Sequence, residues 1–412
     1  MHKTAKLYAY EHYDGPLLEM VELYKAKSGE ELINDQIYAF HDRGERHVSI
    51  RPEMTPTVAR MVAQTHREIP KPIRWYSIPN LMRYEKPQRG RLREHWQFNC
   101  DIFGGADNYS EIEILNMAKD LLQSFGATTE HFEILLNDRK IVNILFDDIL
   151  KVKDEEKKYK LYKIIDKSKK VNSQALDKML NEVIDSDKKQ KLLSYLSLST
   201  FVELEKFLKS ASIETELISF FQLVKLVEKT SLFPFLKYDP SIVRGLDYYT
   251  GIVFELFDKH PDNKRAICGG GSYENLLQIF KEQPLKGVGF GLGDVTLLDF
   301  LKSHNLMPDL SKPCPQIFYS FQSEDDFSLN LNTVESLRKL GVQVEFSFQP
   351  LKPKKAFQIA EKKGAQFVIL VGEEEVKNQT LQIKNLETKD EQVVLINELE
   401  IISEIVSGKI NT

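Results

Sequence analysis

The length and composition of the chain point to a soluble protein of more than one domain. At 412 residues it is too long for one ordinary hydrophobic core, and its 42% apolar and 28% charged residues are typical of a soluble globular protein. No apolar run approaches the roughly 18 residues that cross a membrane, and the first residues lack the apolar core of a secretion signal. Cys100, Cys268 and Cys314 lie too far apart for a disulfide framework or a zinc site, which favours a reducing cytoplasm.

The net charge of −5 argues weakly against a protein wrapped in nucleic acid, but it conceals two basic segments. Residues 83–93 hold five basic side chains against the single acid Glu85, and residues 352–363 hold five lysines against Glu361. Such clusters attract phosphate groups. A lysine run is, however, more commonly a solvated helix face, so neither cluster alone identifies a nucleic-acid site.

The N-terminal part of the chain alternates between helical and strand-like patterns. Apolar spacing predicts a helix from Leu17 to about Ala26, and two alternating runs around Asp42-Arg43-Gly44 predict a β-hairpin. A helix is expected to open at Thr55, followed by proline. Next come two antiparallel strands, IRWYSIPNLMRYE and HWQFNCDIFG, joined by the basic loop KPQRGRLRE, and an amphipathic helix that ends at Gly126.

Two changes of composition divide the chain. From about 143 to 232 Lys, Asp, Glu and Leu dominate, glycine is absent and the periodicity is helical, so we predict a helical insertion. Apolar strands and glycines then return and complete a first domain, residues 1–310. After a linker that contains proline and serine, residues 313–412 alternate strands and helices, which predicts a sheet with helices on its faces.

Polar and cationic side chains gather on the predicted strand pair and its loop. Strand alternation places His95, Gln97, Asn99 and Asp101 on one face, next to the cations of the loop. One wall would then present cations and, deeper in, hydrogen-bonding groups and an acid. Such a wall can hold a polyphosphate at one end and an amine-bearing substrate at the other. Standing alone, the segment would more simply be a charged hairpin on a solvated sheet face.

Three further segments carry groups that suit ligand binding. RPEMT places the Glu53 carboxylate and the Thr55 hydroxyl at a helix start, where they can bind an ammonium group or serve only as a nearby acid and an N-cap. VRGLDYYTG combines Arg244 with two tyrosines and flanking glycines, which a plain strand-turn seldom needs. CGGGSY and GVGFGLG would let the backbone approach a flat ring, but they match neither a GxxxxGK[ST] phosphate loop nor a dinucleotide-binding unit.

Together and in this order, these segments resemble the histidyl-tRNA synthetases over nearly the whole chain. RPEMTPTVAR is similar to that family's amino-acid-binding turn, NLMRYEKPQRGRLREHWQFNCDIFG to its motif 2, and GVGFGLGD to its motif 3. SIVRGLDYYTGIVFE and CGGGSYENL resemble the two histidine signatures, and RGLDYYTG is the most specific piece because other class II synthetases lack it. The resemblance implies an α+β fold: a class II antiparallel-sheet catalytic domain with a helical insertion, followed by a C-terminal α/β anticodon-binding domain.

The same resemblance implies a histidine–tRNA ligase that activates histidine with ATP and transfers it to tRNA(His). Mg²⁺ would come with the ATP, without a site made of protein ligands alone, and the protein would be a cytoplasmic homodimer without membrane contact. The implied catalytic groups are Arg83 and Arg244. The implied histidine-binding residues are Glu53, Thr55, Gln97, Asp101, Tyr249 and Tyr273; the ATP site adds Glu85, Arg91 and His95 to the two arginines, and tRNA would contact Lys86, Arg89 and Arg93.

Several positions depart from the family pattern. Motif 3 usually ends in an arginine that covers adenine, but Asp294 stands there, and a carboxylate cannot make that cation–π contact. His95 replaces the phenylalanine expected on the opposite face, so either other residues complete the adenine site or ATP binds weakly. Ser272 replaces the signature arginine before Tyr273. The chain also begins near the end of motif 1, Tyr13–Glu19, without most of the preceding helix that helps to build the dimer interface.

Two other functions stay open. A non-catalytic, synthetase-like regulatory subunit would bind histidine or tRNA without ligating them, but the anticodon domain and the presence of Glu53, Arg83, Gln97, Arg244 and Tyr249 favour the ligase. A synthetase for glycine, proline or threonine would share the anticodon domain and is disfavoured by RGLDYYTG. The ligase hypothesis requires Arg83 and Arg244 to share one cavity.

Overall fold

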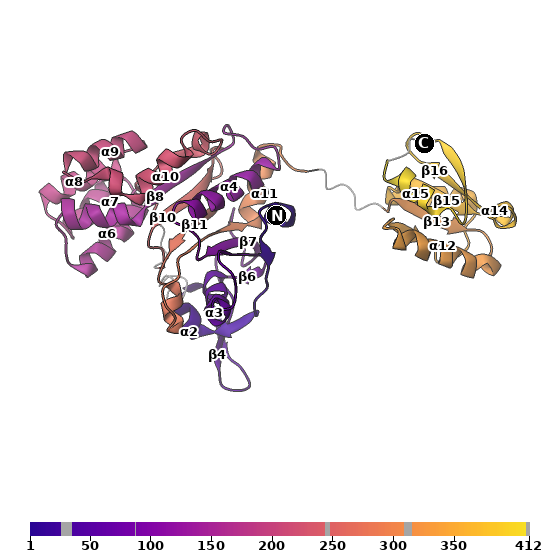
Figure 1. The fold of residues 1–412 in the computed structure, drawn as a ribbon, viewed down its shortest axis with the longest axis horizontal. Coiled ribbons are helices and arrows are strands. Elements are labelled where there is room, and N and C mark those ends of the chain that lie inside the picture. Colours follow the sequence, from indigo (N-terminus) through magenta and orange to yellow (C-terminus); the bar gives the residue numbers. More distant parts are fainter. Residues whose placement is uncertain (26–34, 87, 244–247, 309–314, 409–412) are drawn as a thin grey trace. The chain divides into compact units, whose positions relative to one another are not determined.

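The computed structural model describes residues 1–25, 35–86, 88–243, 248–308 and 315–408. They belong to two compact units, Met1–Met307 and Pro308–Thr412 (Figure 1). In the described part of the chain, no helix has both the length and the apolar character needed to cross a bilayer.

A nine-stranded sheet forms the centre of the first unit. Its order is β1-β5-β7-β12-β11-β10-β8-β9, and β6 pairs with the first residues of β7. The pairs from β5 through β8 are antiparallel, while β1 with β5 and β8 with β9 are parallel pairs at the two edges. The strands are β1 (Glu11–His12), β5 (Ile73–Ser77), β6 (Asn80–Met82), β7 (Glu94–Phe103), β8 (Phe132–Asp138), β9 (Leu236–Tyr238), β10 (Ile252–Asp258), β11 (Ala266–Tyr273) and β12 (Gly287–Gly293). The predicted α+β class with an antiparallel sheet is therefore confirmed.

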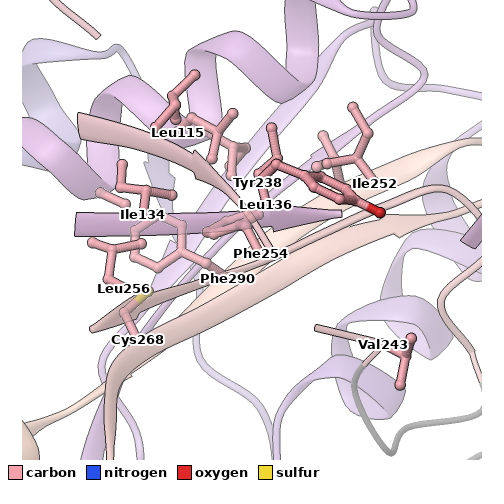
Figure 2. Close-up of a cluster of buried hydrophobic side chains, with 14 of the residues drawn as sticks. Leu115, Ile134, Leu136, Tyr238, Val243, Ile252, Phe254, Leu256, Cys268 and Phe290 are labelled. Carbon is pink, nitrogen blue, oxygen red and sulfur yellow. The ribbon is translucent and has the colours of Figure 1, made fainter. Parts of the chain in front are cut away.

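One face of this sheet is apolar and covered by helices. The helices α4 (Tyr109–Gln123) and α11 (Asp294–Ser303) contact β7, β11 and β12, and α1 (His2–Leu7) contacts α4. Figure 2 shows part of this core, in which Phe254, Leu256 and Phe290 of the sheet lie in one cluster with Leu115 of α4. Because side chains alternate along a strand, the opposite face of β7, β12 and β11 carries polar residues and glycines.

A second apolar cluster and a small sheet lie in the N-terminal part of this unit. Helix α3 (Thr55–Thr65) contacts the 3₁₀ helix η5 (Leu276–Phe280), and their apolar residues share a cluster with Phe103 and Tyr273. The hairpin predicted around Asp42 is confirmed: β3 (Tyr38–His41) pairs with β4 (His47–Ile50), and the Asp42 carboxylate accepts a hydrogen bond from the Gly44 amide.

The predicted helix from Leu17 is wrong over its first turn. Leu18–Met20 forms the strand β2, which pairs with β4, and Val21–Lys25 is helical (α2), while Ala26 lies outside the described residues. Local spacing does not reveal this, because the strand is held by a partner that is distant in the sequence.

The segment predicted as a helical insertion is helical in the structure, and most of its helices gather at one end of this unit (Figure 1). The helices α6 to α9 begin after side chains that accept hydrogen bonds from their first amides, namely Asp154, Asn172, Asp185 and Thr200. Their buried apolar residues join the core cluster that contains β8. The elements are α5 (Arg139–Ile144), η2 (Leu145–Ile149), α6 (Glu155–Lys167), α7 (Ser173–Asn181), α8 (Ser186–Leu196), α9 (Phe201–Ser210), η3 (Thr215–Leu217), α10 (Ser219–Val227) and η4 (Phe233–Phe235).

The second unit is a five-stranded sheet with helices on both faces, as its alternating pattern predicted. The order is β14-β13-β15-β16-β17, parallel from β14 to β15 and antiparallel beyond. Ile317 and Tyr319 share one cluster with residues of α12 and α15, while Phe318 between them packs with residues of α13. The elements are β13 (Ile317–Phe321), η6 (Glu324–Asp326), α12 (Phe327–Lys339), β14 (Val344–Phe346), α13 (Pro353–Lys363), β15 (Phe367–Val371), α14 (Glu373–Asn378), β16 (Thr380–Asn385), β17 (Glu391–Leu395) and α15 (Leu399–Val406).

Candidate active site

A small cavity lies against the glycine-bearing face of the central strands of the first unit. It collects residues from Glu53 to Gly291, and it includes every described residue predicted to bind the amino acid. Its lining consists of Glu53, Thr55, Arg83, Gln97, Asn99, Asp101, Tyr248, Tyr249, Gly269, Tyr273, Gly289, Phe290 and Gly291.

The glycines of β11 and β12 make room for the side chains of this cavity. A Cβ atom at Gly289 would lie 2.2 Å from Oδ1 of Asp101, and one at Gly291 would lie 2.8 Å from Cδ of Gln97. At Gly271 it would lie 2.7 Å from the Tyr249 ring. These glycines therefore make room for the protein's own side chains, and the expectation that such glycines also let the backbone approach a flat ring stays a prediction.

Asp101 and Tyr273 form a buried pair at the bottom of the cavity. The Tyr273 hydroxyl donates a hydrogen bond of 2.5 Å to Oδ1 of Asp101, and the two residues are only 1% and 4% exposed, respectively. Burial raises the pKa of Asp101 to about 7, and the Tyr273 hydrogen bond acts in the opposite direction. Burial also raises the pKa of Tyr273 well above its usual value. This carboxyl, which lines the cavity, can therefore change its charge near neutral pH.

Glu53 and Thr55 lie together at the start of α3. The Tyr248 hydroxyl is 3.4 Å from Oε2 of Glu53 and 3.4 Å from the Thr55 hydroxyl, so the three groups form one polar corner. Thr55 is not the N-cap: it is the first residue of the helix, Met54 takes the cap position, and no side chain caps this end. A buried carboxylate with two hydroxyls can bind an ammonium group.

A larger cavity of about 760 Å³ adjoins the small one. The two cavities share Arg83, Gln97, Gly269 and Gly291 in their linings. Arg83 is held by a hydrogen bond of 2.8 Å from its Nε to the Pro52 carbonyl. The rest of the larger lining is mostly charged or small: Glu85, Gln88, Gly90, Arg91, Leu92, His95, Lys170, Glu255, Phe257, Lys264, Arg265, Ala266, Ile267, Cys268, Gly293, Asp294, Val295 and Thr296.

The predicted ATP-site residues Glu85, Arg91 and His95 all line this larger cavity. Arg91 and Glu85 form an ion pair with 2.8 Å between Nε and Oε2. Burial, assisted by the nearby Arg83 charge, lowers the pKa of His95 to about 4, so its ring is neutral at physiological pH. Asp294 also lines the cavity; its Oδ1 accepts a hydrogen bond of 3.1 Å from the Trp96 amide, and burial raises its pKa.

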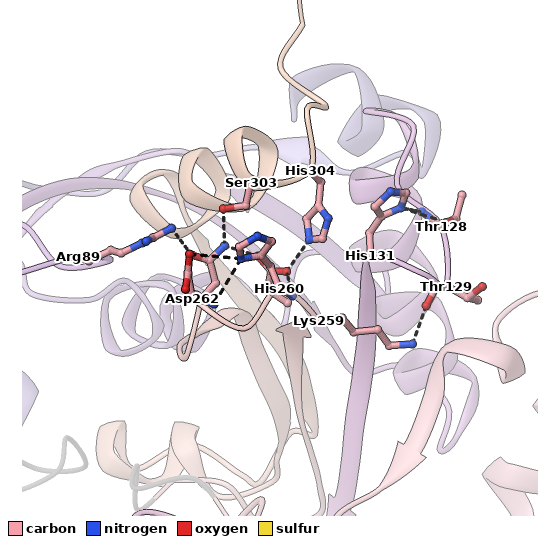
Figure 3. A network of polar contacts seen from close by, with 11 residues as sticks. Arg89, Thr128, Thr129, His131, Lys259, His260, Asp262, Ser303 and His304 are labelled. Atoms are coloured by element: carbon pink, nitrogen blue, oxygen red, sulfur yellow. Dashed lines mark hydrogen bonds and ion pairs between the residues drawn. The ribbon is translucent and has the colours of Figure 1, made fainter.

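The basic loop between β6 and β7 is fastened to the turn between β10 and β11. A guanidinium nitrogen of Arg89 donates a 2.8 Å hydrogen bond to the Asn263 side chain. Asn263 in turn bonds Asp258 and Ser303, and the second oxygen of Asp258 lies 2.6 Å from Nε2 of His304 (Figure 3). The residues predicted to contact tRNA, Lys86, Arg89 and Arg93, are exposed on this loop and its edge.

Two of the departures from the family pattern have different structural consequences. Ser272 lies outside both cavities; its hydroxyl donates a 2.8 Å hydrogen bond to Oε1 of Glu111, which also pairs with Lys286 at 2.6 Å. This replacement therefore does not alter the lining. Asp294 does, because it brings a carboxylate where the family pattern has a cation.

Arg244 lies outside the described residues, so its predicted proximity to Arg83 is not tested. The residues that flank this segment are described. Arg139 donates hydrogen bonds to the carbonyls of Val243 and Tyr249, at 3.1 and 3.0 Å. The two ends of the segment are thus held by one guanidinium.

Sequence reasoning missed several residues of the two linings. Tyr248 was quoted within a motif but given no role, and Lys170, Glu255, Lys264 and Arg265 were not considered. Strand alternation gave no signal for Arg265, because this residue precedes β11 and the pairing of β11 with β10 is irregular between Ala266 and Cys268. Among the described residues, no three His, Cys, Asp or Glu side chains converge as a metal site.

Comparisons with known proteins agree with this geometry. A family model described as histidyl-tRNA synthetase matches residues 1–296, and a model described as anticodon binding domain matches residues 328–405. A histidine–tRNA ligase of Leptospira biflexa is 41% identical over 392 residues, which cover 95% of this chain and 89% of the relative. One of Thermoplasma volcanium is 34% identical over 406 residues, covering 96% and 91% of the two chains.

Solved structures show the same fold. Histidyl-tRNA synthetase from Nostoc sp. PCC 7120 superposes with a TM-score of 0.78 at 20% identity, covering 99% of this chain and 94% of that one. A Bacillus halodurans protein titled "ATP phosphoribosyltransferase regulatory subunit/histidyl-tRNA synthetase" gives a TM-score of 0.71 at 22% identity, covering 90% and 92%. Fold alone does not separate a ligase from a regulatory relative. The family model and the sequence relatives do establish the lineage, and the chain belongs to the histidyl-tRNA synthetase family, a group of class II aminoacyl-tRNA synthetases.

Proposed function

We propose that this protein is a histidine–tRNA ligase, which activates histidine with ATP to histidyl-adenylate and transfers the histidyl group to the 3′ end of tRNA(His). The position of Arg83 is the observation that supports this most. Its side chain lines both cavities, so it lies between a pocket with groups that bind an amine and a pocket rich in cations. The carboxylate of an amino acid and the α-phosphate of ATP must meet at such a junction.

The small cavity carries the groups that histidine requires. We assign Glu53, Thr55 and Gln97 to the α-amino group, and Asp101 to an N–H of the imidazole, with Tyr249 at the imidazole edges beside Asp101 and Tyr273 closing the pocket. A buried acceptor that loses its partner is costly, so a substrate without the ring N–H would be disfavoured. A site of this kind can reject such analogues by about 10⁴–10⁵.

The larger cavity would hold ATP, with Arg91 contacting its phosphates and Glu85 and His95 contacting its adenine base. The carboxylate of histidine attacks the α-phosphorus and pyrophosphate leaves, so negative charge builds on the phosphoryl oxygens. A fixed guanidinium such as Arg83 stabilises that charge without reorganisation. We assign the same role to Arg244 on its motif alone, since it lies outside the described residues.

Mg²⁺ would enter together with ATP, as the resemblance to the family implies. Glu85 and Glu255 line the larger cavity and offer the oxygen ligands that this cation prefers. The ion would neutralise charge on the leaving pyrophosphate. The protein residues would orient the two reactants and exclude alternative geometries.

The proposal extends to partners. Lys86, Arg89 and Arg93 offer exposed cations to the tRNA backbone, and residues 328–405 match an anticodon-binding model. We further propose a cytoplasmic homodimer, as the motif resemblance implies. Gel filtration with light scattering tests the dimer, and a monomer at micromolar concentration would contradict it.

Histidine-dependent exchange between ATP and labelled pyrophosphate tests the activation step directly. The ligase should exchange with histidine and not with glycine, proline or threonine. Binding of histidine without exchange at saturating ATP would support the regulatory alternative, and exchange with another of these amino acids would overturn the assigned specificity.

A further inference from the structure

Arg265 lines the larger cavity, but none of the roles proposed for the ATP site is assigned to it. It directly precedes β11 and lines the cavity together with Arg91 and Glu85. The register of β11 with β12 pairs Cys268 with Leu292, so Arg265 and Asp294 lie at the same end of neighbouring strands. The cation of Arg265 thus lies close to position 294, where the family pattern has an arginine and this chain has an aspartate.

The basic loop is shaped to accommodate this side chain. Gly90 has a φ of +75°, which favours glycine, and a Cβ atom there would lie 2.8 Å from Cδ of Arg265. The loop is held in this place because Arg89 donates to Asn263, two residues before Arg265. The stem of Arg265 therefore packs against the loop that also carries Arg91.

The guanidinium of Arg265 lacks a partner of its own among the described residues: it makes no ion pair and no hydrogen bond with them. Burial lowers its pKa, and the neighbouring Arg91 charge lowers it further, while Glu85 acts in the opposite direction. The Glu85 carboxylate, however, already pairs with Arg91. Two partly buried guanidiniums thus lie near one carboxylate that forms an ion pair with Arg91, and an anion with several oxygens would satisfy their remaining donors.

We propose that Arg265 and Arg91 together bind the β- and γ-phosphates of ATP. This inference rests on the proposed function, since it assumes that the larger cavity is the nucleotide site. A phosphate accepts two parallel N–H bonds from a guanidinium, and it would also relieve the repulsion between the two arginines.

The test compares Arg265→Ala and Arg265→Lys with the unchanged protein in histidine-dependent ATP–pyrophosphate exchange. We expect Arg265→Ala to raise KM for ATP about 10- to 100-fold, as for loss of hydrogen bonds to a charged group, with KM for histidine changed less than about twofold. Arg265→Lys should recover part of the loss, since it keeps the charge but not the fork. The matched control is Arg67→Ala, an arginine with a 72% exposed side chain that pairs with Glu282 away from both cavities.

Calorimetric binding of ATP and AMP separates a phosphate contact from a contact with the base. Arg265→Ala should weaken ATP about tenfold or more and AMP less than about twofold, because AMP lacks the β- and γ-phosphates. Equal weakening of both nucleotides, or no weakening of either, would overturn the inference. If Arg265→Ala melts at a lower temperature, Arg265→Gln gives the same comparison with less loss of packing. ATP binding remains measurable even if the unchanged protein shows no exchange, so failure of the proposed function and failure of this inference are distinguishable.

Discussion

The two adjoining cavities differ in how their polar groups are satisfied. In the small cavity the groups bond one another: Tyr273 donates to Asp101, and Tyr248 lies within 3.4 Å of Glu53. In the larger cavity, charged groups from the basic loop, the helical insertion and the β10–β11 turn face one space, and Arg265 has no protein partner among the described residues. The polar groups of the small cavity are thus hydrogen-bonded without a ligand, whereas the larger cavity holds a cation that lacks a partner among the described residues and that a ligand would pair.

This difference explains where the sequence departs from its family. Changing one member of a buried hydrogen-bonded pair leaves the other unpaired, which costs about 1–3 kcal/mol or more, so the small cavity tolerates little change. At the larger cavity, Asp294 accepts a hydrogen bond from a backbone amide, and neither Asp294 nor His95 belongs to a hydrogen-bonded pair of side chains among the described residues, so a replacement at these positions leaves no side chain unpaired. Accordingly, Asp294 and His95 are replacements at the larger cavity, while Glu53, Gln97, Asp101 and Tyr249 keep the pattern at the small one.

The largest effect is expected from Arg83, the cationic residue that lines both cavities. Arg83→Ala should lower kcat/KM in the exchange reaction by about 10²–10³, the usual cost of removing a fixed group that stabilises transition-state charge. Arg83→Lys should stay well below the unchanged protein, because a lysine cannot hold Pro52 and the phosphoryl group with one planar fork. A loss below tenfold, with normal melting, would mean that the junction is not where the reactants meet.

Asp101→Asn should disturb the small cavity alone. We expect KM for histidine to rise about 10- to 100-fold, since a charge-assisted hydrogen bond to the imidazole is lost, with KM for ATP changed less than about threefold. An equal rise in KM for histidine and KM for ATP would contradict the assignment of the two substrates to separate cavities.

The pH dependence of histidine binding tests the pKa of Asp101, which burial raises to about 7. The ionised form accepts the imidazole N–H, so KM for histidine should rise as pH falls through this value and Asp101 gains a proton. The substrate imidazole also titrates, with a pKa of about 6.5. The ratio of KM between unchanged protein and Asp101→Asn, measured from about pH 5.5 to 8.5, removes that contribution. A ratio that does not change with pH would show that Asp101 keeps one charge state.

The fold was predictable wherever local pattern and pairing agree. The hairpin at Asp42, the strands on either side of the basic loop and the alternation in the C-terminal unit follow from periods that a short window contains. Three short strands could not be predicted in this way: Leu18–Met20, β1 and β9. Each has only two or three residues and is held by a partner strand that is distant in the sequence. Their sequences carry too few residues to show a period.

The residues of the site likewise divide into those that a local pattern predicts and those that depend on long-range pairing. His95, Gln97, Asn99 and Asp101 were found because alternation along one strand is local. The position of Arg265 beside Arg91 depends on the long-range pairing of β11 with β12 and on the docking of the basic loop, so no local pattern reveals it. The glycines of β12 were noticed, but their role against Asp101 and Gln97 requires the register between β12 and β7.

Tyr273→Phe should have an intermediate effect, and it acts through its neighbour. The hydroxyl donates to Asp101 and thereby lowers the pKa of that carboxyl, so its removal should raise the pKa further. Less Asp101 is then ionised at neutral pH, and KM for histidine should rise about 2- to 10-fold, with its pH midpoint moved upward. Tyr249→Phe is the control, since its ring lines the same cavity and Asp101 bonds Tyr273 instead. An unchanged midpoint in Tyr273→Phe would mean that the bond is not maintained in solution.

The smallest effect is expected at His95, which lines the larger cavity and stands where the family pattern has a phenylalanine. Because burial and Arg83 lower the pKa of His95 to about 4, the ring is neutral over the range in which the enzyme is assayed. It can therefore serve as an uncharged flat surface, as phenylalanine would, and His95→Phe should change KM for ATP less than about threefold. His95→Lys would instead add a cation beside Arg83 and remove the flat surface, so it should weaken ATP binding more than His95→Phe although phosphate is anionic. If lysine bound ATP better than phenylalanine, charge and not ring stacking would govern this part of the cavity, and the nucleotide base would have to lie elsewhere.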